Sequence, residues 1–370
     1  MNTLYKAALA LAALCGLVAL VLLVFGVETG AGPAVVGLFV ALAIGVRGLP
    51  VARDFAFTVW IFAAVAAAMF YPAAFTSVGD FETKVLIVPL IQVIMFGMGT
   101  ALSLGDFWGV VKMPKGVLVG LVCQFTIMPF VGLGLAMAFG FPPEIAAGVV
   151  LIGSAPSGVA SNVMAFIAKA NLPLSVTLTA VSTLMAPIMT PFLMQTLAGQ
   201  FVPIDFVDMM LSIINMVIVP IALGLLFNKL LHGRAAWLDR AMPVVSMVGI
   251  AVIITIITAL GRDDLLAIGV TLVLAAIIHN FAGYFFGYWG CRLARMDEES
   301  CRTIAIEVGM QNGGLASGIA VEMGKVATVG LAPAVFGPWM NISGSALANY
   351  WRRTSGEPAR TSEPEATPAT

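Results

Sequence analysis

A chain of 370 residues in which 60% are hydrophobic and only 10% are charged does not have the composition of a soluble globular protein, where charged residues make up roughly a quarter of the chain. The net charge of −1 provides no basic surface, so we expect no nucleic-acid partner. Four cysteines without C-x-x-C spacing and only two histidines exclude a disulfide framework and a histidine-rich metal site. We therefore expect a polytopic membrane protein that has the lipid bilayer around it.

Long uncharged runs follow one another along the chain. About 20 apolar residues in a helix cross a bilayer, and each run is near or above this length. The window 303–321 is uncharged except for Glu307, and the other eleven runs are 7–27, 29–46, 55–79, 85–105, 116–143, 145–168, 170–204, 209–228, 241–261, 265–291 and 326–351. The runs are continuously apolar and lack the alternation of membrane strands. The sequence therefore predicts an all-α fold with twelve transmembrane spans.

Lysine and arginine residues sort to one side of these spans. With the N-terminus in the cytoplasm, the inner loops and ends receive 15 of the 18 basic residues and the outer loops receive Lys84, Arg262 and Lys325. This bias follows the positive-inside rule and predicts a multi-pass protein of a bacterial-type inner or plasma membrane with both termini cytoplasmic. The first run is longer than a usual signal-peptide core, and no small-x-small cleavage site follows it. We therefore favour a retained helix over a cleaved leader.

The spans divide into three parts and a tail. Residues 1–50 form an N-terminal transmembrane hairpin with almost no polar residues, and 353–370 read as a disordered cytoplasmic tail rich in Pro, Ser, Thr and Glu. The ten-helix core, 51–352, splits into sets of five spans at 51–200 and 201–352. Because five is odd, the second set enters the membrane from the opposite side, which predicts two inverted repeats. Each set carries a polar, glycine-rich break in its fourth span, and such matched breaks indicate a transporter binding site.

The first break is GSAPSGVASN, residues 153–162. Pro156 removes a backbone donor and clashes with the preceding turn, and two glycines loosen the same turn. We expect the helix to end here and a second half-helix to begin near Ser157–Ala160, with its positive dipole end suited to an anion. Ser161 and Asn162 add side-chain oxygens. The alternative is a proline-kinked helix whose small residues allow close packing.

The second break is GMQNGGLASG, residues 309–318, which follows Glu307 closely. A charge at the bilayer centre costs from about 2.5 kcal/mol upward, so Glu307 is paired, protonated or near the interface. Gln311 is four residues further on, which in a helix is the same face, and Asn312 lies beside it. Gly313-Gly314 is expected to break the helix. The spans contain no lysine or arginine to pair with Glu307. A bound cation is therefore its simplest partner, and a proton is the next.

Five motifs occur in order: MFGMGTALSLGDF (95–107), QFTIMP (124–129), ASNVMAFIAKANLPLSVTLTAVSTLMAPIMTP (160–191), EVGMQNGGLA (307–316) and NISGS (341–345). With them the chain resembles the bile acid:sodium symporter family, including its bacterial members, over about residues 50–352. The resemblance implies a sodium-coupled symporter of an organic anion such as a bile acid, a pantoate-like hydroxy acid or a keto acid.

The resemblance also implies two sodium ions, co-transported and held where the two broken helices cross. It assigns the first ion to Ser161, Asn162, Ser175, Thr179 and Glu307. It assigns the second ion to Gln124, Glu307, Gln311 and the backbone carbonyls of Val308 and Met310. Independently of the resemblance, Ser175 and Thr179 are four residues apart, which places them on one helical face.

The half-helix ends are the candidate substrate contacts, namely Ser157, Gly158, Val159, Ala160, Asn312, Gly313 and Gly314. Here the chain departs from the family pattern, which reads Cys-Pro-Gly-Gly-Thr before Ala-Ser-Asn. This sequence has Ala-Pro-Ser-Gly-Val at 155–159. The departure leaves the sodium ligands intact and puts the identity of the anion in doubt.

Other functions are less well supported by the residues. A proton-coupled transporter of organic anions would use Glu307 as its proton carrier. An intramembrane enzyme needs a nucleophile–base pair or a metal triad, and the spans offer one histidine and one glutamate, so we expect no enzyme. A channel or a sensor on the same fold would show no uphill accumulation. His279-Asn280 is expected to be a buried hydrogen-bonding pair.

Overall fold

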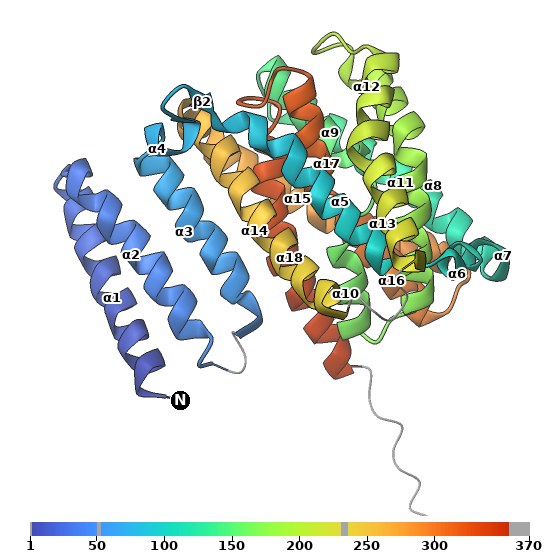
Figure 1. Cartoon of the computed structure of the whole chain (residues 1–370), viewed down its shortest axis with the longest axis horizontal. Coiled ribbons are helices and arrows are strands. Elements are labelled where there is room, and N and C mark those ends of the chain that lie inside the picture. The colour runs from blue at the N-terminus through green and yellow to red at the C-terminus, as the bar shows by residue number, and fades with distance from the viewer. Residues whose placement is uncertain (1, 50–52, 231–235, 355–370) are drawn as a thin grey trace, which may run out of the picture.

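The computed structural model describes residues 2–49, 53–230 and 236–354, which are almost entirely helical (Figure 1). The first part of the chain contains α1 Thr3–Val24, α2 Glu28–Val46, η1 Arg53–Phe55, α3 Ala56–Phe70, α4 Ala73–Thr76, β1 Ser77–Val78, β2 Phe81–Glu82, η2 Thr83–Leu86, α5 Ile87–Ala101, α6 Leu104–Phe107, α7 Gly109–Lys112, α8 Pro114–Ala138, α9 Pro143–Ser154, α10 Ala160–Ile167, α11 Leu172–Leu193 and the π-helical η3 Met194–Ala198. The second part contains α12 Phe206–Ile213, the π-helical η4 Ile214–Ile218, α13 Val219–Leu230, α14 Ala236–Leu260, α15 Arg262–Leu293, α16 Glu298–Gly309, α17 Gly313–Glu322 and α18 Leu331–Thr354.

Seven of the described helical segments are long and apolar enough to cross a membrane, and three shorter apolar helices lie at Gly30–Val46, Ala56–Phe70 and Pro143–Ser154. The chain is therefore an integral, multi-pass, mainly α-helical membrane protein, as predicted. Helix occurs in each of the twelve predicted runs. The predicted tail, 353–370, lies outside the described residues except for the last two residues of α18.

The N-terminal hairpin lies at one edge of the molecule, where α2 packs between α1 and α3 (Figure 1). Small residues form the contact: α1 buries Ala8 and Ala12, and α2 buries Ala41. A Cβ added to Gly45 would lie 2.6 Å from the Leu9 side chain, so glycine is needed for this approach. In a membrane, helices associate largely through such close packing of small residues. The opposite face of α1 carries exposed leucines and valines, as expected for a helix surrounded by lipid.

The sequence predicts one span over 55–79, but the last residues of this run do not belong to the helix. Helix α3 stops at Phe70, because Pro72 cannot continue the hydrogen-bond ladder. A small antiparallel hairpin of β1 and β2 follows, paired Ser77 with Glu82. Its turn contains Gly79 at φ +61°, a conformation that favours glycine. These strands are a short exception to the predicted all-α fold.

Helices α5 and α13 approach each other through two glycines. A Cβ on Gly99 would clash with the carbonyl oxygen of Ile221, and a Cβ on Gly224 would clash with that of Phe96. Because both obstacles are backbone atoms, a side-chain rotation cannot relieve the clash.

Replacing Gly224 with Ala is therefore expected to lower stability by about 1–3 kcal/mol, the usual cost of overpacking. Thermal unfolding of the purified protein in detergent measures the change. Gly269→Ala is the matched control, because the nearest side-chain atom to a Cβ there is at 3.4 Å, an ordinary contact. Equal melting temperatures for Gly224→Ala and the wild type would contradict the close approach.

Two helices are interrupted, and the interruptions occupy corresponding places along the chain. Among the long segments after the hairpin, α3, α5, α8, α9–α10 and α11 make one group of five, and α12–α13, α14, α15, α16–α17 and α18 make the next. The fourth segment of each group is broken, at 155–159 and at 310–312. Helix is thus interrupted at both places where the sequence predicts a break.

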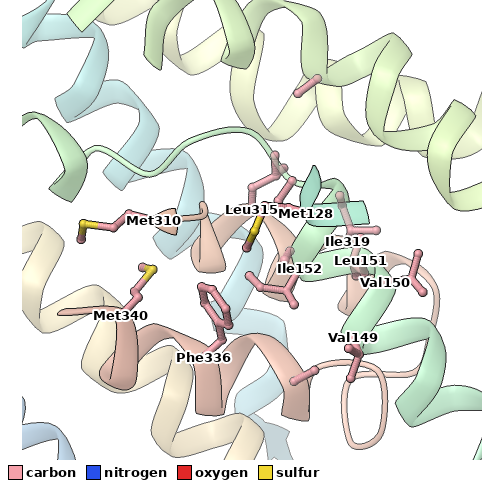
Figure 2. Close-up of a cluster of buried hydrophobic side chains, with 14 of the residues drawn as sticks. Met128, Val149, Val150, Leu151, Ile152, Met310, Leu315, Ile319, Phe336 and Met340 are labelled. Atoms are coloured by element: carbon pink, nitrogen blue, oxygen red, sulfur yellow. The ribbon is translucent and has the colours of Figure 1, made fainter. Parts of the chain in front are cut away.

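An apolar core surrounds the second break. Figure 2 shows Met310 and Met340 beside Phe336, with Met128 and Ile152 also in the cluster. All five side chains are buried. They come from α8, α9, the second break and α18, so the crossing of the breaks lies within packed protein.

Candidate functional site

The two interrupted helices cross at their breaks, and their backbones pair there. Ser157 and Gln311 form an antiparallel bridge. The amide of Gly158 donates to the carbonyl of Met310 at 2.8 Å, and the amide of Asn312 donates to the carbonyl of Pro156 at 2.8 Å. Backbone released from a helix inside a membrane must find partners within the protein. Here each break supplies those partners to the other.

Glu307 is buried, with 2% of its surface exposed, and three hydroxyl groups surround its carboxylate. Its Oε1 accepts hydrogen bonds from Ser161 at 2.6 Å and from Ser175 at 2.5 Å. Its Oε2 accepts one from Thr179 at 2.9 Å. Ser175 and Thr179 lie on one face of α11, as their spacing predicted. The carboxylate is therefore held by α10, α11 and α16 together.

Asn162 completes this group of oxygens. Its Oδ1 lies 2.8 Å from the Ser175 hydroxyl and 3.2 Å from the Thr179 hydroxyl, and the hydroxyls of Ser161 and Thr179 are 3.4 Å apart. These three contacts and the three contacts to Glu307 make six oxygen–oxygen contacts. Only the hydroxyls of Ser161, Ser175 and Thr179 supply hydrogens to them, three in all. A hydroxyl donates only one hydrogen, so some contacts bring lone pairs together. Such an oxygen-rich group suits a hard cation.

A second group of predicted residues contacts the two breaks directly, at Ala155 and Gln311. Gln124 donates through Nε2 to the Gln311 side-chain oxygen at 2.7 Å and to the Ala155 carbonyl at 3.0 Å. Gln311 donates through Nε2 to the Val308 carbonyl at 2.6 Å. The structure thus brings Gln124, Gln311 and Val308 together.

Three details of the predicted second group differ. Gln311 does not share a helical face with Glu307, because α16 ends at Gly309 and Gln311 belongs to the break. The Met310 carbonyl is engaged by the Gly158 amide. The Glu307 carboxylate makes its hydrogen bonds to the three hydroxyls of the first group, and its backbone carbonyl, not its side chain, accepts from Ser157 at 3.1 Å.

The predicted half-helix ends are present, and α10 begins at Ala160 while α17 begins at Gly313. The break itself falls at 310–312, so the Gly-Gly pair starts α17 and does not itself interrupt the helix, in contrast to the prediction. Of the seven candidate substrate contacts, Ser157, Gly158 and Asn312 are buried, whereas Val159, Ala160, Gly313 and Gly314 are partly exposed or exposed.

Comparison with known proteins bears on what this site does. A model of the Sodium Bile acid symporter family matches residues 88–268. "Uncharacterized sodium-dependent transporter YocS" of Bacillus subtilis (strain 168) is 39% identical over 298 residues, which cover 80% of this chain and 91% of that protein. "Probable sodium/metabolite cotransporter BASS1, chloroplastic" of Arabidopsis thaliana is 32% identical over 300 residues, 81% of this chain and 74% of that protein. "Ileal sodium/bile acid cotransporter" of Oryctolagus cuniculus is 33% identical over 240 residues, 62% of this chain and 67% of that protein.

The chain belongs to the sodium/bile acid symporter family. The resemblance seen in the five motifs is thereby confirmed, and with it membership of a family of sodium-dependent transporters. These relatives carry names of sodium-dependent transport, and they lend no support to proton coupling through Glu307. Among the residues that the structure describes, no cluster of three His, Cys, Asp or Glu side chains could hold a metal ion.

Thr190 and Asn171 lie near the Glu307 cluster and were missed from the sequence. The expected buried, hydrogen-bonded pair His279-Asn280 is present, with His279 bonded to the Met128 carbonyl at 2.8 Å, but the particular partner of Asn280 was not predicted. Thr190 donates to the Ser154 carbonyl at 2.8 Å and so caps the last turn of α9. Asn171 caps α11 through the Leu174 amide at 3.1 Å. Asn280 donates to the Gly309 carbonyl at the end of α16, at 2.8 Å. Asn171 carries a sequence signal for a cap, an Asn before Leu-Pro at a helix start, which is typical of an N-cap.

Asn171 also connects the start of α11, which carries Ser175 and Thr179, to α16, which carries Glu307. Its backbone amide donates to the Glu299 carbonyl at 3.4 Å, and its carbonyl accepts from the Thr303 hydroxyl at 3.2 Å. The first turn of α16 is capped by Asp297. Burial raises the pKa of this carboxyl, but the hydrogen bonds that it accepts, including those from the Ser300 amide and hydroxyl, together hold the pKa below its ordinary value.

Proposed function

We propose that this chain is a sodium-coupled symporter of a small organic anion. The arrangement of Glu307 among the hydroxyls of Ser161, Ser175 and Thr179 is the observation that carries the proposal. It supplies a negative charge and several neutral oxygens at one buried point, which is the ligand chemistry of a hard cation. The ligands come from both interrupted helices and from α11, so binding a cation couples these elements.

The proposal includes two sodium ions as co-transported substrates. The first binds the group of Ser161, Asn162, Ser175, Thr179 and Glu307. The second binds near Gln124, Gln311 and the carbonyls of Val308 and Met310. The Gln311 side-chain oxygen and the Val308 carbonyl now accept hydrogen bonds from Gln124 and Gln311, and each oxygen keeps a second lone pair that can face an ion.

The anion is proposed to bind at the starts of α10 and α17. The amides of Val159, Ala160 and Gly314 have no acceptor among the described residues. The side-chain nitrogen of Asn312 is buried and has no hydrogen-bond partner in the described part of the chain. Free amides at helix starts favour an anion. Two sodium ions balance Glu307 and one carboxylate or sulfate, so a monoanion leaves no net charge at the site.

Alternating access is proposed to follow from two inverted repeats, 51–200 and 201–352, with both termini cytoplasmic. On one side of the crossing, α17 packs closely against α5 and η4: a Cβ on Gly318 would lie 2.6 Å from Ile91 and 3.0 Å from Met216. On the other side, α10 leaves Val163 and Phe166 exposed by 55% and 69%.

Uptake into vesicles containing the purified protein tests the proposal. A panel of labelled bile acid, hydroxy acid, keto acid and sulfated steroid is offered with an inward sodium gradient, or with choline in place of sodium at the same pH. We expect at least one anion to accumulate against its gradient in sodium only. Sodium-independent uptake, or equilibration without accumulation, would contradict a sodium symporter.

A further inference from the structure

Asn280, a fully buried residue of α15, contacts the end of the half-helix that carries Glu307. Its Nδ2 donates to the Gly309 carbonyl at 2.8 Å, and none of its surface is exposed. Gly309 is the last residue of α16, where carbonyl groups have no partner within the helix. An unpartnered carbonyl inside a membrane is costly, so this bond stabilises the place where α16 ends.

The Asn280 side chain is itself fixed in one orientation. Ser343 donates to its Oδ1 at 2.6 Å, and the Tyr284 hydroxyl lies 3.1 Å from the Ser343 hydroxyl. Because Ser343 gives its hydrogen to Asn280, Tyr284 acts as donor to Ser343. The bonds thus run in one direction from Tyr284 to Gly309. This leaves the amide nitrogen of Asn280 facing the carbonyl that it caps.

Close packing holds the same turn of α16 against α15. A Cβ on Gly283 would lie 2.8 Å from the Gly309 Cα and 3.1 Å from the Val308 carbonyl oxygen. Gly309 in turn lies against the ring of Tyr284, leaving no room for a side chain. The last turn of α16 therefore meets α15 on one side, while Glu307 meets the hydroxyls of α10 and α11 on another.

The first interrupted helix has a matching arrangement. Gln124 on α8 donates to the Ala155 carbonyl at 3.0 Å, just beyond the end of α9. In both cases an amide side chain of the preceding long helix caps the end of the first half-helix. Gln124 is already among the residues proposed to bind sodium, whereas Asn280 has no assigned role.

We propose that Asn280 is a positioning residue for sodium binding. This inference rests on the proposed function. By fixing Gly309 it holds the last turn of α16, and Glu307 lies only two residues before that point. The carboxylate is therefore kept where Ser161, Ser175 and Thr179 can share a cation with it. Without the bond, the end of α16 can shift and the sodium ligands separate.

Asn280→Leu removes the donor at similar side-chain size. Because a buried carbonyl then loses its partner, the sodium concentration for half-maximal uptake is expected to rise by about fivefold or more. The sodium concentration for half-maximal thermal stabilisation in detergent should rise equally. The substrate KM at saturating sodium should stay within about twofold, since Asn280 does not lie at the proposed anion site.

Two further variants make the test decisive. Tyr284→Phe keeps the ring against Gly309 and removes only the first donor, so a smaller shift of about twofold is expected. Asn349→Ala is the matched control, because the Asn349 amide bonds within its own helix, to Ser345 at 2.9 Å, and no shift is expected. Wild-type sodium dependence in folded Asn280→Leu overturns the proposal. If that variant does not fold, an unchanged Tyr284→Phe overturns it instead.

The two proposals can fail separately. Sodium-independent uptake by the wild type would refute the symporter, and the sodium-dependent thermal shift would then still show whether a sodium site exists. A sodium-dependent wild type together with an unshifted Asn280→Leu would refute only the positioning role.

Discussion

Replacing Glu307 with Gln is expected to lower sodium-driven uptake by about 100-fold or more. The exchange keeps the size of the side chain, removes its charge and turns one acceptor oxygen into a donor. Hydrogen bonds to a charged group contribute about 1.5–3 kcal/mol each, and about 3 kcal/mol corresponds to a factor of about 100. The side chains that donate hydrogen bonds to this carboxylate are the neutral hydroxyls of Ser161, Ser175 and Thr179, so none of them can supply the lost negative charge. Initial uptake rates in vesicles with a sodium gradient measure the loss.

Glu322→Gln provides the matched control for this exchange. Glu322 is exposed at the end of α17, and its hydrogen bond to Ser212 is long, at 3.4 Å. We expect its uptake to equal that of the wild type. Sodium should also raise the melting temperature of the wild type and of Glu322→Gln, but not that of Glu307→Gln, because a ligand stabilises only the state that binds it. Uptake by Glu307→Gln within tenfold of the wild type would contradict the assigned role.

Two features of the proposed first cation group could be predicted from local rules in the sequence. Ser175 and Thr179 share a helical face, and Pro156 must interrupt a helix. The same rule failed for Gln311, since the helix ends at Gly309, and the position of a helix end depends on partners elsewhere. The bond between Ser161 and Glu307 spans 146 residues, and no local pattern gives such a distance. Only the family resemblance placed these residues together.

In the fold, too, the features that depend on a single run of the sequence could be predicted, and those that depend on contacts with other helices could not. Hydropathy placed a helix in every apolar run, because burial of apolar surface in lipid is a property of each run alone. It did not give the end of α3 at Phe70, where Pro72 and the Gly79 turn intervene. Nor did it reveal that Thr190 and Asn280 cap helix ends, because both are single polar residues whose partners lie on other helices.

Replacing Gly158 with Ala is expected to disrupt the crossing of the two breaks. A Cβ there would lie 2.7 Å from the Gln311 carbonyl oxygen and 3.1 Å from its carbon, both backbone atoms that cannot rotate away. The bond from the Gly158 amide to Met310 would have to lengthen or break. We expect a loss of stability of about 1–3 kcal/mol, typical of overpacking, and at least a tenfold loss of uptake because both proposed cation groups adjoin the crossing.

Two alanine substitutions separate this close approach from a general effect of added bulk. A Cβ added to Gly134 on α8 would have no described atom within 4 Å apart from the nearby backbone of its own helix, so Gly134→Ala should be neutral or stabilising by up to about 1 kcal/mol. Gly313 starts α17, and a Cβ there would have its nearest neighbour at 3.5 Å, so Gly313→Ala should fold and keep its sodium-dependent thermal shift. Because Gly313 lies at the proposed anion site, its variant should instead raise the substrate KM. Equal losses of stability in Gly158→Ala and Gly313→Ala would mean that the backbone bridge does not set the geometry of the site.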